Sequence, residues 1–173
     1  GRSTKEFTDR DWDSYRNGTI GFVFQSYNLI GHLSVIENVK LALSISGESN
    51  KENDIKAKKA LEDVGLGDHL YKKPNQLSGG QMQRVAIARA LVKHASIYVY
   101  DDSFSALDAK TEAKLRANLA EINQQSIIFV VAQRISSVTD ATKIIVLHEG
   151  NVVGIGTHDE LKESNQIYQE IMN

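Results

Sequence analysis

The chain of 173 residues has no cysteine, a single proline and a formal net charge of only −2. The absence of cysteine excludes a disulfide framework and a thiolate metal site. Its apolar runs are far shorter than the roughly 20 residues of a membrane-spanning helix, so no run predicts one. The nearly balanced charge provides no basic surface for nucleic acid or anionic lipid. What is present, 41% hydrophobic residues, predicts one globular domain long enough to bury a core.

The most informative segment is 77–81 (Leu-Ser-Gly-Gly-Gln), which runs directly into the apolar stretch 82–91. Ser78 is a favoured helix N-cap, and Gly79 and Gly80 let backbone N–H groups approach a phosphate closely. The peptide dipoles at such a helix end also favour negative charge. A glycine turn ahead of a core helix would explain the two glycines alone. The complete pentapeptide with its Gln-Arg-Val-Ala-Ile-Ala-Arg-Ala continuation favours an anion site instead.

Two acidic residues, Asp101 and Asp102, follow the short apolar run 97–100. Such a run predicts a buried parallel strand, and open α/β sheets bind their ligands at the edge where these strands end. A helix N-cap formed by Asp102 and Ser103 is the alternative explanation of the two acids.

Two glutamines also follow apolar runs. Gln25 comes after the β-rich run 19–24, and Gln133 comes after the run 126–132, which predicts a further buried strand. A glutamine in such a place is by itself an ordinary solvated loop residue, so only its position relative to other motifs gives it meaning.

In this order, the segments resemble the ATP-binding cassette family, the ATPases that drive ABC transporters. Segment 77–81 resembles the family signature, and the resemblance implies that Ser78, Gly79, Gly80 and Gln81 contact ATP. Asp101 resembles the Walker B aspartate that holds Mg²⁺ through water, and Asp102 stands where the family usually has the glutamate that polarises the attacking water. Gln25 resembles the Q-loop residue that meets Mg²⁺ and this water. Gln133 stands at the usual place of the switch histidine, and Ser105–Asp108 resembles the D-loop that runs along a partner subunit, with Asp108 in a nucleotide-binding role.

The resemblance implies an α/β fold with a P-loop NTPase-like core, truncated at its N-terminus. Residues 26–93 form the helical signature subdomain, and residues 1–25 and 94–173 form the remaining core. ATP and Mg²⁺ are the implied cofactors. The implied partners are a second ABC ATPase domain, identical or different, and transmembrane transporter domains, which place the chain peripherally on the cytoplasmic side of a membrane. A DNA-repair ATPase of this type would carry a long coiled coil before the signature, where this sequence has no sustained heptads.

Two departures from the family pattern bear on activity. No Gly-x-x-x-x-Gly-Lys-[Ser/Thr] occurs, so the Walker A loop that cradles the β- and γ-phosphates is missing, and we expect a fragment of a cassette. Asp102 is one methylene shorter than glutamate, and a displacement of about 1 Å at a reacting group can cost about 10²-fold in rate. Gln133 cannot carry the charge of an imidazolium. The substitutions at Asp102 and Gln133 together resemble the degenerate site of heterodimeric exporters. They favour a second hypothesis, in which the chain is a nucleotide-binding and dimerisation module without turnover.

The two halves of the chain resemble different branches of the family. Segments 20–29 and 74–81 resemble the macrolide- and lipoprotein-export ATPases, whereas segments 101–108, 132–136 and 156–161 resemble multidrug and peptide exporters. The transported substrate and the direction of transport are therefore left open.

The periodicity of the sequence also predicts individual elements. Predicted helices cover 8–15, 34–43, 55–64, 78–93, 109–123, 159–163 and 167–172, and predicted strands cover 19–24, 96–100, 126–132, 143–147 and 152–155. Segment 47–54 is expected to be flexible.

Overall fold

The computed structural model describes residues 3–44, 49–122 and 124–172. The chain forms two compact units, which divide between Phe129 and Val130 and are described separately. The predicted division into a subdomain at 26–93 and a remaining core stays a prediction.

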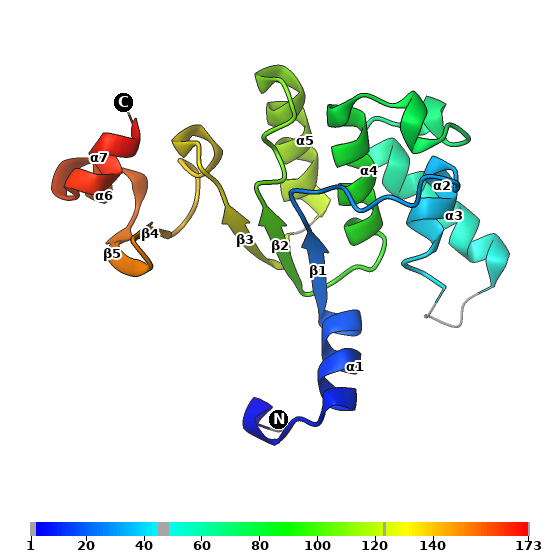
Figure 1. Cartoon of the computed structure of the whole chain (residues 1–173), viewed down its shortest axis with the longest axis horizontal. Helices are drawn as coiled ribbons and strands as arrows, with labels where there is room; N and C mark the ends of the chain where they lie inside the picture. The colour runs from blue at the N-terminus through cyan, green and yellow to red at the C-terminus, as the bar shows by residue number, and fades with distance from the viewer. Residues whose placement is uncertain (1–2, 45–48, 123, 173) are drawn as a thin grey trace. The chain divides into compact units, whose positions relative to one another are not determined.

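The first unit contains most of the helices and a parallel sheet (Figure 1). Its elements are η1 (Thr4–Glu6), α1 (Asp9–Thr19), β1 (Ile20–Val23), α2 (Val35–Lys40), α3 (Asn50–Asp63), η2 (Gly67–His69), η3 (Pro74–Gln76), α4 (Gly79–Leu91), β2 (Ile97–Asp101), α5 (Ala109–Ile122) and β3 (Ile127–Val131), whose last residues cross the boundary. The strand order is β1-β2-β3. Strands β1 and β2 are parallel, with Ile20 opposite Ile97 and Val23 opposite Tyr100. Their carboxyl ends therefore lie together, as the sequence predicts.

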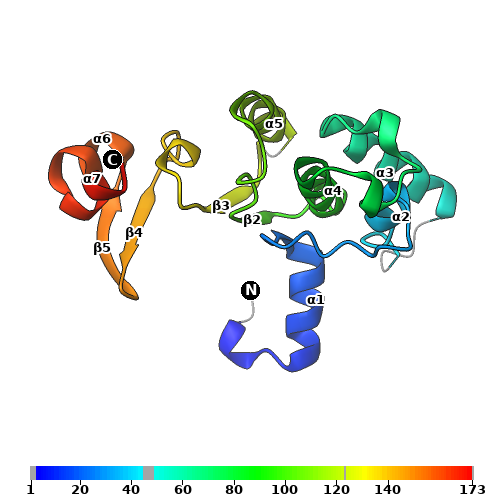
Figure 2. The same cartoon turned by 45° about the horizontal axis from the view of Figure 1, so that its top comes forward.

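The two faces of this sheet differ in how they are covered. Val23, Tyr98 and Tyr100 are almost completely buried, and α4 and α5 lie on one side of the sheet (Figure 2). Phe22 and Phe24 alternate with the buried residues of β1 and are 42% and 46% exposed. Their rings contact each other with centroids 4.3 Å apart. One sheet face is thus packed against helices, and the other presents apolar side chains.

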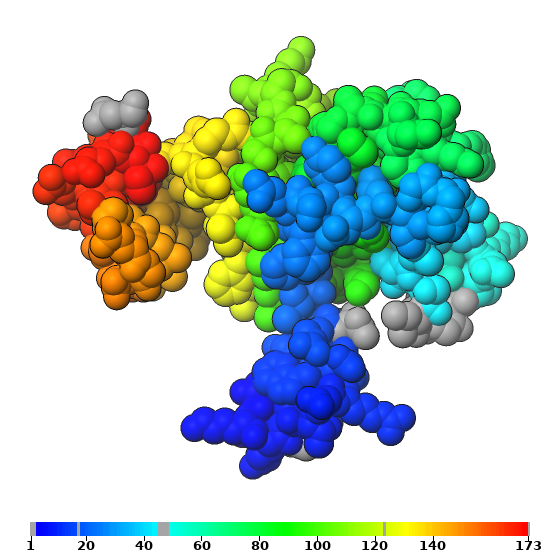
Figure 3. Space-filling model, in the orientation of Figure 1, coloured from blue at the N-terminus to red at the C-terminus, as the bar shows by residue number. Residues whose placement is uncertain are grey.

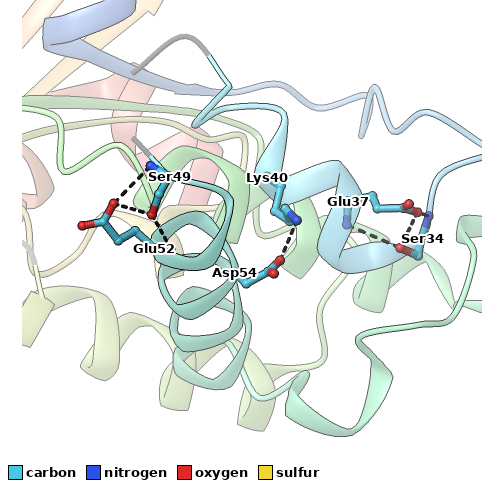
Figure 4. Close-up of polar contacts among 6 residues, drawn as sticks. All are labelled: Ser34, Glu37, Lys40, Ser49, Glu52 and Asp54. Carbon is cyan, nitrogen blue, oxygen red and sulfur yellow. Dashed lines mark hydrogen bonds and ion pairs between the residues drawn. The ribbon is translucent and has the colours of Figure 1, made fainter. Parts of the chain in front are cut away.

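The helices before α4 begin at reciprocal side-chain caps. Ser34 and Glu37 form one capping box at the start of α2, and Ser49 and Glu52 form another at the start of α3 (Figure 4). The hydrogen bonds from the two serines lower the pKa of both glutamates. An ion pair of 2.5 Å between Lys40 and Asp54 joins the two helices. Local sequence chemistry therefore fixes where α2 and α3 start.

Asn38 on α2 is a fully buried polar residue. Its Oδ1 accepts the N–H of Ile30 at 2.8 Å, and its Nδ2 donates to the carbonyls of Ile30, Leu33 and Ser34. One side chain thus holds the segment that follows Gln25 against α2.

The second unit contains a hairpin and two short helices. Its elements are η4 (Ile135–Ser137), β4 (Ile144–His148), β5 (Asn151–Gly156), α6 (His158–Ser164) and α7 (Gln166–Met172). The antiparallel strands β4 and β5 are joined by Glu149 and Gly150, both with positive φ, as a tight hairpin requires. Ile144, Val146, Leu161 and Tyr168 form the core of this unit. The predicted hairpin is confirmed.

Several predicted elements are confirmed and some are corrected. The predicted N-caps Thr8, Ser34 and Ser78 are all observed. Helix α1 extends to Thr19 instead of ending at Tyr15. Helix α3 begins at Asn50, because Ser49 caps it, so the expectation of flexibility is wrong for residues 50–54; residues 47 and 48 lie outside the described part.

The expectation that β3 is buried is also wrong. Ile127 is 59% and Phe129 is 54% exposed, and β3 has a neighbouring strand on one side only. An apolar run predicts a strand but does not specify what covers it.

Among the described residues, no helix has the length and apolar character needed to cross a bilayer.

We expect Asn38→Ala to lower the free energy of unfolding by about 1–3 kcal/mol, because it removes the acceptor of the Ile30 N–H and the donor to three carbonyls. Urea unfolding measures the change. The matched control is Asn75→Ala, at an exposed position, which should change stability by less than about 0.5 kcal/mol. Equal effects of the two substitutions would contradict the role of Asn38.

We further expect the chain to self-associate through the apolar residues of its edge strands β1 and β3. Phe22→Thr combined with Phe129→Thr should reduce association in analytical ultracentrifugation. Tyr71→Thr is the control, since Tyr71 is 82% exposed but lies outside the sheet. A wild-type chain that remains a monodisperse monomer would overturn this expectation.

Candidate functional site

The first part of the candidate site is the N-terminal end of α4. Ser78 has extended backbone angles and caps the helix: its Oγ accepts the N–H of Gln81, and Oε1 of Gln81 accepts the N–H of Ser78 at 2.9 Å. This reciprocal cap satisfies two backbone donors. The N–H groups of Gly79 and Gly80 belong to the first turn, where a helix has no carbonyl of its own to receive them. The helix therefore ends in donors suited to an anion.

Both glycines of this end are closely approached by other parts of the first unit. A Cβ on Gly79 would lie 3.0 Å from the hydroxyl of Tyr27. A Cβ on Gly80 would lie 3.0 Å from the carbonyl oxygen of Ala106 and 3.2 Å from Leu107. The segment 105–108, which resembles the D-loop, thus packs directly on the helix end, and only glycine fits without displacement.

The second part of the site is the carboxyl edge of β1 and β2. Nε2 of Gln25 donates to Oδ2 of Asp102 at 3.2 Å, although the two residues are far apart in the sequence. Asp101 and Asp102 are both half-buried. The structure therefore brings together Gln25 and Asp102 at the edge where the sequence predicts ligand binding.

Buried and local hydrogen bonds fix the turn that carries Asp102. Asp102 has a φ of 46°, in the left-handed region. The completely buried Ser103 donates to the carbonyl of Val23 at 2.9 Å, and Ser105 donates to the carbonyl of Asp102 at 2.9 Å. The turn is thereby tied both to β1 and to itself.

Asp102 does not cap a helix, since the next helix, α5, begins at Ala109. The residue directly before α5 is Asp108, which caps this helix. It accepts the N–H of Thr111 at 2.9 Å and the hydroxyl of Thr111 at 2.6 Å. These hydrogen bonds lower the pKa of Asp108, the hydroxyl making the larger contribution. The alternative explanation of the two acids as a helix cap is therefore wrong for Asp102. Asp108 is a cap, and its predicted contact with nucleotide stays a prediction.

Gln133 lies after β3, in the second unit, and its side chain is exposed. The contacts at the end of α4 and at the edge of β1 and β2 involve only residues of the first unit. The predicted role of Gln133 at the place of the switch histidine therefore remains a prediction.

The sequence did not single out Arg89, which links α4 to the segment after Gln25. Its guanidinium donates to the carbonyls of Asn28 at 2.6 Å and Tyr27 at 3.0 Å, and burial lowers its pKa. Figure 3 shows the surface where the light-blue segment after β1 lies against green residues of the first unit. Arg89 belongs to the segment 83–90 that follows the signature. Its acceptors are backbone carbonyls, which no sequence motif reveals.

The residues at the sheet edge suit Mg²⁺ better than a fully protein-ligated metal. Within the described ranges, no group of three or more histidine, cysteine or acidic residues could hold a metal ion. Mg²⁺ commonly keeps several waters and takes one or two protein ligands together with substrate phosphates. The carboxylate of Asp101 and the amide oxygen of Gln25 fit this pattern, because the hydrogen bond to Asp102 uses only the amide nitrogen of Gln25.

We expect Gly80→Ala to lower stability by about 1–3 kcal/mol, because the new methyl group would press on the carbonyl of Ala106. Thermal unfolding measures the loss. Gly31→Ala is the control, since no atom lies within 4 Å of its added Cβ. If Gly80→Ala were as stable as the control, the close packing of segment 105–108 on α4 would be contradicted.

The comparisons with known proteins agree with these features. Residues 2–105 match the family model described as ABC transporter. An uncharacterized ABC transporter ATP-binding protein of Thermotoga maritima is 40% identical over 156 residues, which are 90% of this chain and 67% of that protein. The lipoprotein-releasing system ATP-binding protein LolD of Syntrophus aciditrophicus is 41% identical over 142 residues, 81% of this chain and 64% of that protein.

The structure is similar to the ATP-binding cassette MJ0796 in a dimeric post-hydrolysis state bound to ADP and Pi, with a TM-score of 0.82 and 37% identity over 89% of this chain and 69% of that chain. The chain thus spans about two thirds of the length of these relatives. The predicted α/β cassette fold is confirmed. By sequence and by structure, the chain belongs to the ATP-binding domains of ABC transporters.

Proposed function

We propose that this chain contributes one half of an ATP site formed with a second cassette, and that ATP binding and hydrolysis there drive a transporter. The single observation that carries this proposal is the end of α4, where Ser78 and Gln81 cap each other and leave the N–H groups of Gly79 and Gly80 for a ligand. Such an end suits the γ-phosphate of ATP, which carries negative charge and accepts hydrogen bonds.

A second cassette is part of the proposal because the signature end of one ABC cassette faces the phosphate loop of another, an arrangement that the resemblance implies. The other subunit would hold the phosphates of the ATP that faces Ser78, Gly79, Gly80 and Gln81. Asp108, on the adjoining segment, would lie along that subunit. The dimeric arrangement of the similar cassette supports this proposal.

At the sheet edge, Asp101 would hold Mg²⁺ through water and Gln25 would bind it through its amide oxygen. Bound Mg²⁺ neutralises charge that develops on the transferring phosphoryl group. Asp102 would orient the attacking water, and its hydrogen bond to Gln25 keeps the carboxylate at this edge. Gln133 would hydrogen-bond the γ-phosphate.

We propose transmembrane transporter domains as the further partners, with the chain bound peripherally on the cytoplasmic side. The 41% identity to LolD supports an export-type role for the chain. This agrees with the resemblance of segments 20–29 and 74–81 to lipoprotein-export ATPases. Segments 101–108, 132–136 and 156–161 instead resemble multidrug and peptide exporters, so the substrate class follows from neither half alone.

Asp102 and Gln133 favour a second candidate function, a site that binds ATP and dimerises without turning it over. The shorter carboxylate of Asp102 and the neutral amide of Gln133 both weaken hydrolysis while leaving the binding groups of α4 unchanged. The two candidate functions share the same ATP-dependent pairing and differ only in turnover.

The pairing is tested by mixing this chain with the cassette MJ0796 and Mg²⁺ in the presence or absence of a non-hydrolysable ATP analogue. Light scattering should detect a mixed dimer only with the analogue. Ser78→Arg should abolish the mixed dimer, because a large side chain would block the end of α4. Ser14→Arg, on the exposed face of α1, should leave it intact. A mixed dimer that forms equally without the analogue would refute the proposal.

By itself, the chain should bind Mg-ATP only weakly, because the signature end and the sheet edge serve two different composite sites and neither includes a phosphate loop. Calorimetric titration measures this affinity. A micromolar or tighter dissociation constant for the isolated chain would show that it builds a whole nucleotide site alone.

Turnover is tested in a chain to which a phosphate-loop segment has been joined, in the presence of a competent partner. Asp102→Glu with Gln133→His should raise the ATPase rate at least about tenfold, since placement and charge at the phosphoryl group are both improved. Each single substitution should do less, because both side chains would act on the same water and γ-phosphate. An unchanged rate with intact dimerisation would show that these residues do not limit hydrolysis.

A further inference from the structure

Both ends of the Gln81 side-chain amide are engaged. Oε1 accepts the N–H of Ser78 at 2.9 Å, and Nε2 lies 3.0 Å from Nε2 of His69. Only an oxygen can accept from the Ser78 N–H, which fixes the orientation of the amide. The amide nitrogen can only donate, so Nε2 of His69 must be the acceptor. The imidazole is therefore neutral, with its hydrogen on Nδ1.

The loop that carries His69 is anchored on both sides. After α3 the chain turns at Gly65, which has a φ of 71°. Arg84, on α4, donates to the carbonyls of Val64 and Gly65 at 3.1 and 3.2 Å. Leu66 and Leu70, which flank His69 in the loop, are buried. His69 is thus held against α4 by contacts other than its own.

The contact with Gln81 leaves Nδ1 of His69 in an unfavourable position. Nδ1 is buried, and it has no hydrogen-bond partner among the residues that the structure describes. A buried donor without a partner lowers stability, and an apolar residue at this place would avoid that loss. Apolar packing alone therefore does not explain why residue 69 is a histidine. Its role as a hydrogen-bond acceptor for Nε2 of Gln81 does explain it.

We propose that His69 is a positioning residue for the signature glutamine. By accepting from Nε2 of Gln81, it keeps the amide oxygen on the N–H of Ser78. Without this acceptor the amide could rotate and bring its carbonyl oxygen toward the γ-phosphate, where the partial negative charge of that oxygen would repel the phosphate oxygens. The consequence for ATP rests on the proposed function, but the contact itself does not.

The contact is tested by nuclear magnetic resonance on the chain alone, near neutral pH. The ¹⁵N shifts of His69 should show the tautomer with hydrogen on Nδ1. Gln81→Glu should reverse this tautomer, because a carboxylate that still accepts from Ser78 presents a second oxygen to His69 and requires a hydrogen on Nε2. A wild-type ring with its hydrogen on Nε2, or a tautomer unchanged by Gln81→Glu, would overturn the proposal.

The positioning effect is tested with the matched pair His69→Gln and His69→Met, which have similar size but differ in having an acceptor. In the mixed dimer with MJ0796, His69→Met should weaken the apparent affinity for the ATP analogue on the order of fivefold, the scale of one lost hydrogen bond. His69→Gln should stay close to wild type. Equal affinities for the two variants would overturn the positioning role.

The two arms separate the failure of this inference from that of the proposed function. If the wild-type chain does not pair in the presence of the analogue, the proposed function fails, and the tautomer still decides whether His69 holds Gln81. If His69→Met fails to fold, Gln81→Glu, together with hydrogen exchange of the Ser78 N–H in His69→Gln, decides the contact. Exchange in His69→Gln as slow as in the wild type is the expected result, and clearly faster exchange would count against the role of the acceptor.

Discussion

The reciprocal hydrogen bonds between Ser78 and Gln81 are the constraint on which the candidate site depends. They use the serine oxygen and the glutamine oxygen as acceptors in capping the helix, so the backbone N–H groups of two glycines and the hydroxyl hydrogen of Ser78 remain as donors at the end of α4. Backbone donors need no side-chain ordering when a ligand binds, and their direction follows that of the helix axis. Segment 105–108 lies close to Gly80, so its residues stand next to the free N–H groups at the end of α4.

This helix end is also joined to the sheet edge, which would serve a different ATP molecule. Arg89 near the other end of α4 holds the carbonyls of Tyr27 and Asn28, and Gln25 just before them is hydrogen-bonded to Asp102. A displacement of Gln25 is thus opposed by a charged, partly buried side chain on the signature helix. Removing these acceptors would leave a half-buried guanidinium unpaired, which costs more free energy than at an exposed position.

Local chemistry explains why much of this arrangement could be predicted from the sequence. Ser34 and Ser78 begin helices because serine oxygens accept backbone N–H groups three residues on, a pattern visible in the sequence. Asp101 and Asp102 follow a short apolar run, which is likewise visible in the sequence and predicts a strand ending at these acids. The long-range contacts of Arg89 and His69 were not predictable. Arg89 binds carbonyls that any residue could supply, and the histidine that contacts Gln81 lies in a loop whose place is set by Arg84. The exposure of Phe129 likewise depends on what covers the sheet.

The backbone at Asp102 gives a physical reason for the shorter acid at the place where a glutamate is usual. A left-handed φ of 46° is tolerated better by aspartate and asparagine than by most residues with side chains, because their short polar groups bond locally. The turn is held in this conformation by Ser103 and Ser105, so the strain is compensated by neighbouring hydrogen bonds. A carboxylate so close to the backbone reaches less far than that of a glutamate, and one of its oxygens accepts from Gln25. The same geometry that stabilises the turn therefore shortens the reach of this carboxylate from the sheet edge.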